Sequence, residues 1–317
     1  MEDLIIPLSV PANRRSTYKR NYKLATANTG KLLLFAGDQK IEHLNDDFYG
    51  KSIDPEDASP EHLFLIAANI PGAVLATHIG LLDRYGQDYR DLPYIVKLNG
   101  KSPINRDEDD IFSGSLVSKD DLLRFIDNSK LKIVGLGYTV YLGSKREAKM
   151  LKQAAKAIQT AHEEGLLAII WMYPRHSSIK NEEDLHLIAG GAGVAASLGA
   201  DFVKVKYPYK KLDPTKKAEA FEETIKAAGR TGVICVGGSR LPADRLLRHL
   251  SRQLEAGSKG LAIGRNLHQR SLEEAAALGR ALTAMIHKGA KTTEAIRIMK
   301  SKVQIKKRNK SKILGLF

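Results

Sequence analysis

The feature that most constrains the fold is an eightfold alternation of short apolar runs with segments that carry helix-start signals. Each apolar run has the length and aliphatic or β-branched character of a strand. Strands that alternate strictly with helices, with no break in composition, predict a parallel sheet covered by helices. The predicted strands span residues 31–37, 72–77, 93–98, 131–136, 166–172, 201–207, 232–236 and 259–263.

Capping residues indicate where several of the intervening helices begin. Ser59 before Pro60, and Ser118, each predict a helix start. The sequence Ser144-Lys145-Arg146-Glu147 has the spacing of a capping box and predicts a helix that runs to His162. The other predicted helices span residues 80–85, 181–198, 214–228, 242–256 and 271–287.

Eight strand–helix units predict one (β/α)₈ barrel, also called a TIM barrel. The alternative is an open doubly wound sheet, but no Gly-x-Gly-x-x-Gly motif follows the first strand. We expect a single domain over residues 1–317, with an irregular or helical extension at 1–28, the barrel at 29–288 and a basic tail at 289–317.

The net charge of +14 is concentrated near the end of the chain, because residues 286–317 hold ten basic residues and one acidic residue. A basic tail is not a groove with interleaved aromatic side chains, so nucleic acid is an unlikely partner. The tail could bind polyanions, which is the non-enzyme alternative. It could instead pack on a neighbouring subunit or stay in solvent.

The numbers and spacing of cysteine and histidine residues indicate the cellular compartment and whether a metal site is present. A single cysteine, Cys235, excludes a disulfide framework and fits a reducing cytosol. We expect a cytoplasmic protein, since the first residues, Met-Glu-Asp-Leu-Ile-Ile-Pro, have an apolar patch but no basic leader, and no apolar run approaches the roughly 18 residues of a membrane span. The nine histidines form no His-x-x-x-His pair, so we expect no metal and no other cofactor.

Six of the predicted strands end in polar or glycine-rich sequence, and active sites of such barrels lie at the carboxyl ends of the strands. We therefore expect these ends to form one site, in which Lys97 and Lys206 bind the substrate or its phosphate. They are Asp38, Lys97 with Asn99, Trp171 with Tyr173, Lys204 with Lys206, Gly237-Gly238-Ser239, and Gly264-Arg265-Asn266.

Lys204 and Lys206 share one face of a strand whose two faces should both be apolar. Burial lowers the pKa of an ammonium group, and the neutral amine can attack a carbonyl to form a Schiff base. Lys97, across the barrel lumen, would lower the pKa of Lys204 further by like-charge repulsion. The alternative is a pair of lysines whose head groups lie in solvent.

The glycine-rich ends of the last two strands predict a phosphate site, because glycines let backbone N–H groups approach an anion and Arg265 could pair with it. Ordinary tight turns are the alternative. Asp38 could accept a hydroxyl proton, or it could simply be a turn carboxylate. Tyr173 could move a proton at carbon if nearby lysines shift its pKa, or it could be a core tyrosine.

The motifs together resemble the archaeal-type class I fructose-bisphosphate aldolases from about Lys31 to His287. The similar segments are Gly37–His43, Val96–Lys101, Trp171–Arg175, Gly199–Tyr207, Gly-Gly-Ser and Gly-Arg-Asn. The resemblance implies metal-free, reversible cleavage of fructose 1,6-bisphosphate to dihydroxyacetone phosphate and glyceraldehyde 3-phosphate. It implies a Schiff base on Lys204 rather than Lys206, with Tyr173 as the proton-transfer residue and Asp38 as the family's aspartate at the end of the first strand. It also implies a homo-oligomer, such as a pentamer or decamer. From their positions near strand ends, independently of the resemblance, we expect His43 to contact the substrate and Trp171 to form part of the pocket wall.

Two loops depart from the pattern of this family. Many relatives have Asp-His-Gly after the first strand, where this chain has Asp38-Gln39-Lys40. Many have Lys-Tyr-Thr-Gly-Asp after the sixth, where this chain has Lys-Tyr-Pro-Tyr-Lys at residues 206–210. Both loops face the substrate, so a related transferase remains open. Such enzymes make 6-deoxy-5-ketofructose 1-phosphate or an aminodideoxyheptulosonate from the same imine.

Overall fold

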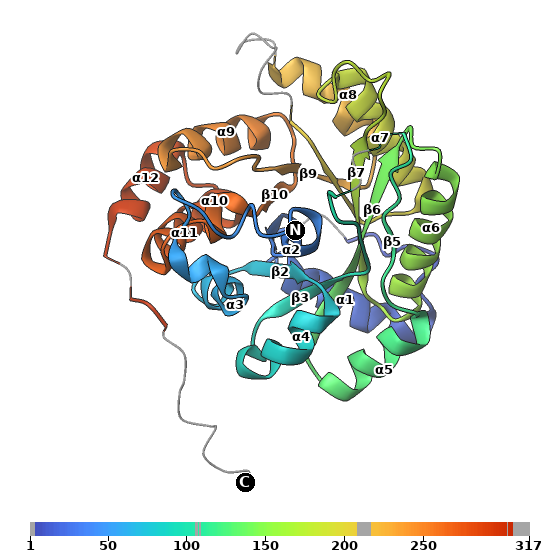
Figure 1. Ribbon diagram of the computed structural model, residues 1–317, viewed down its shortest axis with the longest axis horizontal. Helices are drawn as coiled ribbons and strands as arrows, with labels where there is room; N and C mark the ends of the chain where they lie inside the picture. The colour runs from blue at the N-terminus through green and yellow to red at the C-terminus, as the bar shows by residue number, and fades with distance from the viewer. Residues whose placement is uncertain (1–3, 105–106, 108, 208–216, 303, 307–317) are drawn as a thin grey trace.

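The computed structural model of the chain describes residues 4–104, 107, 109–207, 217–302 and 304–306. Eight parallel strands close into a barrel in the order β1-β10-β9-β8-β7-β6-β3-β2, which confirms the predicted (β/α)₈ fold (Figure 1). The strands are β1 Leu32–Ala36, β2 Ala73–Thr77, β3 Pro93–Lys97, β6 Lys132–Leu142, β7 Leu167–Pro174, β8 Phe202–Val205, β9 Gly232–Val236 and β10 Gly260–Ile263.

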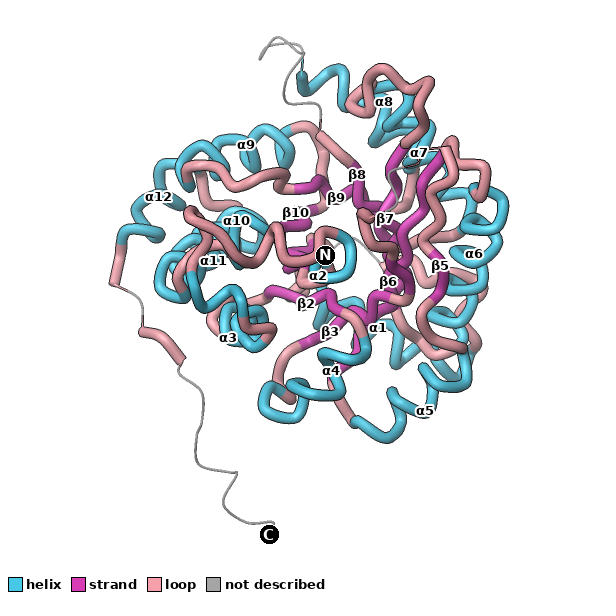
Figure 2. Tube along the Cα trace, viewed as in Figure 1, coloured by secondary structure: helices cyan, strands magenta, loops and turns pink. Residues whose placement is uncertain are grey.

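Helices surround the barrel, as the cyan tubes around the magenta strands show (Figure 2). Those that follow the eight strands are α3 Glu61–Ala68, α4 Ile79–Tyr85, α5 Lys119–Ser129, α6 Glu147–Glu163, α7 Leu185–Leu198, α8 Lys217–Ala228, α9 Ala243–Glu255 and α11 Leu272–Lys288. Four further helices are α1 Arg15–Ala25, α2 Gln39–Glu42, α10 Arg265–His268 and α12 Thr292–Lys300. The insertion after β3 pairs two short antiparallel strands, β4 Asn99–Gly100 and β5 Gly114–Ser115.

The core has two layers because side chains alternate across each strand. Leu32 and Leu34 of β1 belong to a cluster inside the barrel, whereas Leu33 and Phe35 belong to the cluster between strands and helices. All four are completely buried. A strand that is buried on both faces must be apolar throughout, which explains the continuous run Leu-Leu-Leu-Phe-Ala.

The segment before β1 closes the amino-terminal end of the barrel. Tyr18 of α1 joins the inner core cluster, and its hydroxyl donates to Asp201, just before β8. His162 contacts the second oxygen of Asp201 at 3.1 Å, and Asn21 donates to the Gly165 carbonyl at 2.8 Å. This part of the predicted extension is therefore helical and packed against the barrel.

The capping box predicted at residues 144–147 is wrong in its geometry. The Ser144 hydroxyl accepts from the backbone N–H of Arg146 at 3.1 Å and donates to the Ile111 carbonyl, so it serves the loop before the helix. The Glu147 carboxylate accepts from Gly143 instead of the serine N–H, and α6 begins only at Glu147.

Other element ends shift for identifiable reasons. The strand predicted at 131–136 continues to Leu142, because β6 pairs with β7 up to the Leu142–Pro174 pair. The helix predicted from residue 181 begins at Leu185, since Asp184 caps it by accepting from the N–H of Leu187 at 3.0 Å. Ser118 caps α5 as predicted, accepting from the Asp121 N–H. The predicted helix start at Pro214 lies outside the described residues.

Part of the predicted basic tail folds back onto the barrel. Helix α12 packs against α11 and α9 of the same chain. Beyond it, Asn69 exchanges two hydrogen bonds with the backbone of Lys306, at 2.7 and 3.1 Å. The residues from 292 to 300 are therefore not a solvated tail, and the division of the chain at 28 and 288 stays a prediction.

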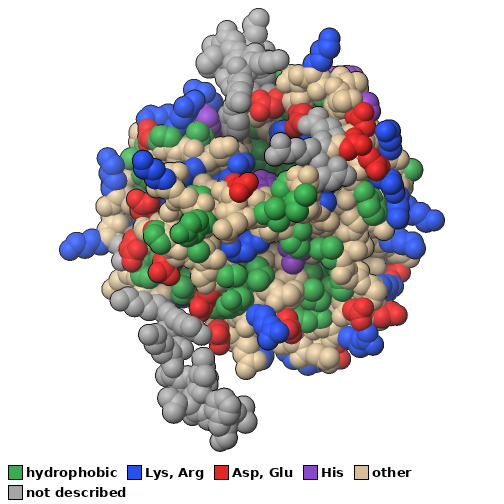
Figure 3. All heavy atoms as spheres, in the orientation of Figure 1, with side chains coloured by type: hydrophobic (Ala, Val, Ile, Leu, Met, Phe, Trp, Pro, Cys, Tyr) green, Lys and Arg blue, Asp and Glu red, His purple; other side chains and the backbone are tan. Residues whose placement is uncertain are grey.

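The surface of the described residues carries mixed charge on the face that Figure 3 shows. Lys and Arg side chains are scattered around this face and interleaved with Asp and Glu.

Among the described residues, no helix is both long enough and apolar enough to cross a membrane.

Candidate active site

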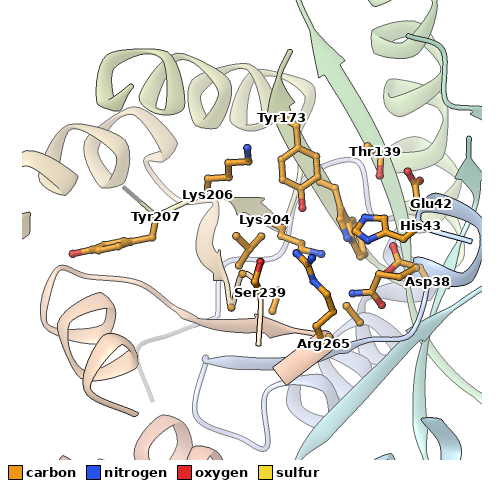
Figure 4. Close-up of a pocket in the computed structure, with 18 of the residues that line it drawn as sticks. Asp38, Glu42, His43, Thr139, Tyr173, Lys204, Lys206, Tyr207, Ser239 and Arg265 are labelled. Atoms are coloured by element: carbon orange, nitrogen blue, oxygen red, sulfur yellow. The ribbon is translucent and has the colours of Figure 1, made fainter. Parts of the chain in front are cut away.

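A cavity of about 810 Å³ opens at the carboxyl ends of the barrel strands. Figure 4 shows the side chains that converge on it. The structure brings all the residues predicted for the site to its wall except Lys97, Asn99 and Asn266. Those that line it are Asp38, His43, Trp171, Tyr173, Lys204, Lys206, Gly237, Gly238, Ser239, Gly264 and Arg265.

Lys204 lies within the barrel wall, where β8 pairs with Trp171 of β7 and Ile234 of β9. Lys204 is 6% exposed, and its Nζ lies 5.1 Å from the centre of the Trp171 ring. Burial lowers the pKa of Lys204 to about 8; attraction to Asp38 opposes this shift and repulsion from Lys97 adds to it. The predicted pKa shift is confirmed, with burial as its largest cause.

The Trp171 ring can lie beside Lys204 because the neighbouring strand has a glycine there. A Cβ at Gly137 of β6 would come within 2.4 Å of the ring, closer than real contacts allow. Gly137 therefore makes the space that the indole fills.

Lys206 differs from Lys204, although the sequence places both on one face of a strand. Its ammonium group forms an ion pair with Glu182 and points away from Lys204 in Figure 4. Its side chain is 28% exposed. Of the two lysines, only Lys204 is a desolvated amine.

Lys97 is completely buried beneath the cavity and does not line it, contrary to its predicted role in substrate binding. Its Nζ donates to the Asn99 carbonyl at 2.7 Å. It also lies 3.9 Å from an oxygen of Asp38 and 3.7 Å from one of Glu42. Lys97 therefore influences the site through its charge, because it neutralises the two carboxylates and repels the Lys204 ammonium group.

Asp38 follows β1 and is 5% exposed. Burial alone would raise its pKa, but Lys204 and Lys97 outweigh that effect and hold the pKa below its usual value. The residue stands at the N-cap position of α2, yet its side chain makes no capping hydrogen bond. The carboxylate is thus ionised and faces the amine rather than capping a helix.

The predicted electrostatics of Tyr173 are wrong. Burial raises the pKa of its phenol, and the carboxylates of Asp38 and Glu42 raise it further, so the lysines do not lower it. Tyr173 is therefore a protonated phenol near neutral pH. It can donate a proton or a hydrogen bond, and its hydroxyl faces the centre of the cavity (Figure 4).

Sequence reasoning missed Glu42 and Tyr141, which both line the cavity. The Tyr141 hydroxyl donates to Glu42 at 3.0 Å, and its ring lies 6.2 Å from that of Tyr173. The four-residue spacing between Asp38 and Glu42 on a helical turn could have indicated that they share a face. Tyr141 was hidden because the strand that carries it was predicted to stop at residue 136.

The glycine-rich ends of β9 and β10 form one side of the cavity. Gly238 has φ +69°, a conformation that favours glycine. Arg265 points toward Lys204 (Figure 4) and lies 3.7 Å from an oxygen of Asp47, which also contacts His43. The glycine-rich strand ends and Arg265 can therefore hold an anion beside the Lys204 amine.

Asn266 does not reach the cavity, so its predicted role in direct phosphate binding is corrected. It is completely buried, and its amide nitrogen donates to the carbonyls of Gly237, Gly238 and Ser239 at 2.9–3.2 Å. Its oxygen accepts from the Leu241 N–H at 2.8 Å. Asn266 fixes the loop whose backbone faces the cavity.

The family model described as "DeoC/LacD family aldolase" matches residues 32–270, which include all eight barrel strands and the residues that line the cavity. The chain belongs to the DeoC/LacD aldolase family. It is 49% identical, over 93% of its own length and 94% of the relative's, to a Methanocaldococcus jannaschii protein named fructose-bisphosphate aldolase/6-deoxy-5-ketofructose 1-phosphate synthase. It is 31% identical to a class 1 fructose-bisphosphate aldolase of Thermoproteus tenax, over 86% and 95% of the two chains.

Two solved structures resemble this aldolase along most of its length. A fructose-bisphosphate aldolase from Slackia heliotrinireducens superposes with a TM-score of 0.91 at 43% identity, over 97% and 98% of the chains. An archaeal fructose-1,6-bisphosphate aldolase, whose catalytic lysine is covalently bound to a carbinolamine intermediate, superposes with a TM-score of 0.71 at 29% identity, over 85% and 99%.

The two sequence departures of this aldolase can be followed only in part. Gln39 lines the cavity, and within the described residues no hydrogen bond reaches its buried amide oxygen. Lys40 turns away, with its Nζ 3.8 Å from the centre of the Phe48 ring. The second departure, at Pro208-Tyr209-Lys210, lies outside the described residues. Within the described part of the chain, no group of three His, Cys, Asp or Glu side chains could hold a metal ion.

Proposed function

We propose that this chain is a metal-independent class I aldolase that reversibly cleaves fructose 1,6-bisphosphate through a Schiff base on Lys204. The observation that carries the proposal is the buried Lys204 amine, with a pKa of about 8, between ionised Asp38 and protonated Tyr173. The names of the relatives from Methanocaldococcus jannaschii and Thermoproteus tenax support the same reaction.

In the proposed cleavage, the neutral Lys204 amine attacks the ketone carbon of the substrate and water leaves as the protonated imine forms. Asp38 accepts the proton of the hydroxyl group on the next carbon but one from the imine carbon. The bond between this hydroxyl-bearing carbon and the carbon next to the imine breaks. Its electron pair forms the enamine, and the hydroxyl-bearing carbon leaves as the aldehyde of glyceraldehyde 3-phosphate. Tyr173 then donates a proton to the enamine carbon, and water hydrolyses the imine to free dihydroxyacetone phosphate.

The opposite side of the cavity would hold the phosphate next to the ketone. Gly237, Gly238 and Gly264 carry no side chain that would block an approaching oxyanion, and Arg265 supplies positive charge. Asn266 would act indirectly, because it fixes the loop through three carbonyl groups.

A transferase of the same family is the second candidate. The relative from Methanocaldococcus jannaschii is named for both an aldolase and a synthase activity. Gln39, at a position where many relatives have histidine, faces the cavity and leaves an amide oxygen available to an acceptor. Such an enzyme would pass the same three-carbon enamine to methylglyoxal instead of a phosphorylated aldehyde.

Borohydride reduction in the presence of dihydroxyacetone phosphate tests the imine. We expect the reduced ligand's mass on the peptide that contains Lys204, and activity that survives a chelator. An adduct on Lys206, or activity abolished by the chelator, would contradict the proposal. Incubation of fructose 1,6-bisphosphate with and without methylglyoxal, followed by mass spectrometry of the products, separates the aldolase from the transferase.

We also infer a cytoplasmic homo-oligomer. Leu8 and Ile5, ahead of the barrel, are 94% and 58% exposed, which favours burial against another copy. Light scattering coupled to size-exclusion chromatography would give the subunit number, and a monomeric mass would contradict the inference.

A further inference from the structure

Three cationic side chains gather where the cavity opens on the β7 and β8 side. Lys101 follows β4, Arg175 follows β7 and Lys206 follows β8, and all three line the cavity. Burial lowers the pKa of Lys101, and repulsion from Arg175 lowers it further. The Arg175 guanidinium also lies 5.4 Å from the centre of the Tyr141 ring.

One carboxylate lies between two of these cations. Glu182 has one oxygen 3.4 Å from Nε of Arg175, and its other oxygen contacts the Lys206 ammonium. The Glu182 side chain is 29% exposed, so solvent and ligands can reach it. The two oxygens of the Glu182 carboxylate thus contact a guanidinium and an ammonium group, as two oxygens of a bound phosphate would.

The cationic cluster lies farther along β7 and β8 than the proposed catalytic residues. Arg175 follows Tyr173 by two residues, and Lys206 follows Lys204 by two residues. Two residues of extended chain advance about 6–7 Å, so both cations lie farther toward solvent than the amine and the phenol. The other anion-binding groups, around Arg265, lie beside the amine. A substrate with phosphates at both ends needs a second anion site farther out.

The phosphate of the aldehyde half of the proposed substrate would bind Arg175 and Lys206, with Lys101 beside them on the cavity wall. We propose that Glu182 competes with this phosphate for the two cations and so sets the preference for the acceptor. This inference rests on the proposed function. A phosphorylated aldehyde must displace the Glu182 carboxylate from both cations. An aldehyde without a phosphate leaves both ion pairs intact, so Glu182 shifts the enzyme toward uncharged acceptors.

The test compares two acceptors that differ only in the phosphate, D-glyceraldehyde 3-phosphate and D-glyceraldehyde, each condensed with dihydroxyacetone phosphate. Glu182→Gln should raise the ratio of kcat/KM for the phosphorylated over the unphosphorylated aldehyde by about fivefold to tenfold. Arg175→Gln and Lys206→Met should each lower it by a similar factor. Glu183→Gln is the matched control, because Glu183 is the next residue in the chain, lines the cavity itself, and its replacement removes the same charge.

A ratio that stays constant or falls in Glu182→Gln would overturn the proposal, as would an equal rise in Glu183→Gln, which would indicate a general charge effect. Borohydride trapping with dihydroxyacetone phosphate alone does not use the outer site and should be unchanged in both glutamine variants. Loss of trapping in the unmodified chain would refute the proposed function itself. Normal trapping with a constant ratio would refute only the role of Glu182.

Discussion

Replacing Lys97 with methionine tests how the fold sets the protonation state of the proposed nucleophile. Methionine keeps an unbranched apolar side chain in a site where the lysine side chain is completely buried. The change removes a positive charge that lowers the pKa of Lys204. It also leaves Asp38 and Glu42, which attract the Lys204 ammonium, without their buried partner. Both effects raise the pKa of Lys204.

The size of the shift can be bounded from the geometry. The Nζ atoms of Lys97 and Lys204 lie 5.7 and 5.1 Å from the centre of the Trp171 ring, so they are at most about 11 Å apart. With an effective dielectric constant of about 20, two unit charges at that distance repel by about 1.5 kcal/mol. That energy corresponds to about one pKa unit. An amine with a pKa of about 8 is roughly one-tenth neutral at pH 7, and one unit more reduces that fraction about tenfold.

We therefore expect imine formation at pH 7 to slow about tenfold in Lys97→Met, with little change above pH about 10. The assay is the single-turnover rate of reductive trapping with dihydroxyacetone phosphate across pH, because it reports the amine and not later proton transfers. Lys97→Arg keeps the charge and should retain the original midpoint if the larger group fits. A Lys97→Met midpoint that is unchanged, or lower than in the unmodified protein, would refute this account of the charge network.

Four further changes have direct readouts. Lys204→Arg should abolish reductive trapping while leaving the melting temperature within a few degrees, and residual trapping would identify another amine. Tyr173→Phe should slow the exchange of the enamine-carbon proton with solvent by about 10²–10⁴-fold while trapping continues, as NMR in deuterated water would show; unchanged exchange would exclude Tyr173 as the acid. Asn266→Ala should raise KM for phosphorylated ligands more than it lowers kcat, because the loop at residues 237–239 loses its anchor; an effect on kcat alone would argue against this role. Tyr18→Phe should lower the free energy of unfolding by about 1–2 kcal/mol in urea titrations without altering kcat, and an altered kcat would mean that the two barrel ends are coupled.

The fold could be predicted because each of the eight strand–helix units repeats the same pattern of an apolar run followed by a helix. Eight apolar runs remain recognisable even when their ends are misplaced by a few residues, and barrel closure follows from their number. The ends themselves depend on pairing with distant strands. The predicted fourth strand stops at residue 136, but β6 continues beside β7 to Leu142, and this extension carries Tyr141 into the cavity.

The site could be located but its internal roles could not. Strand ends predict which residues approach the cavity, and of the predicted residues only Lys97, Asn99 and Asn266 fail to line it. Each is held elsewhere by local partners. Lys97 pairs with two carboxylates, Asn99 donates to two carbonyl groups and Asn266 donates to three. The protonation of Tyr173 also depends on Glu42, whose position on a one-turn helix is not evident from sequence alone.

The closure of the barrel floor by α1 has a consequence for how the chain reaches its native state. Tyr18 and Asp201 are separated by 183 positions, so the piece synthesised first cannot dock until more than half of the polypeptide has emerged from the ribosome. Until then its apolar side chains have no barrel to enter, and a nascent chain arrested before Asp201 should keep α1 sensitive to protease. In a circular permutant that places residues 4–30 after residue 300, the segment with α1 would be synthesised last. This permutant should refold with fewer early states in which α1 packs at a wrong place.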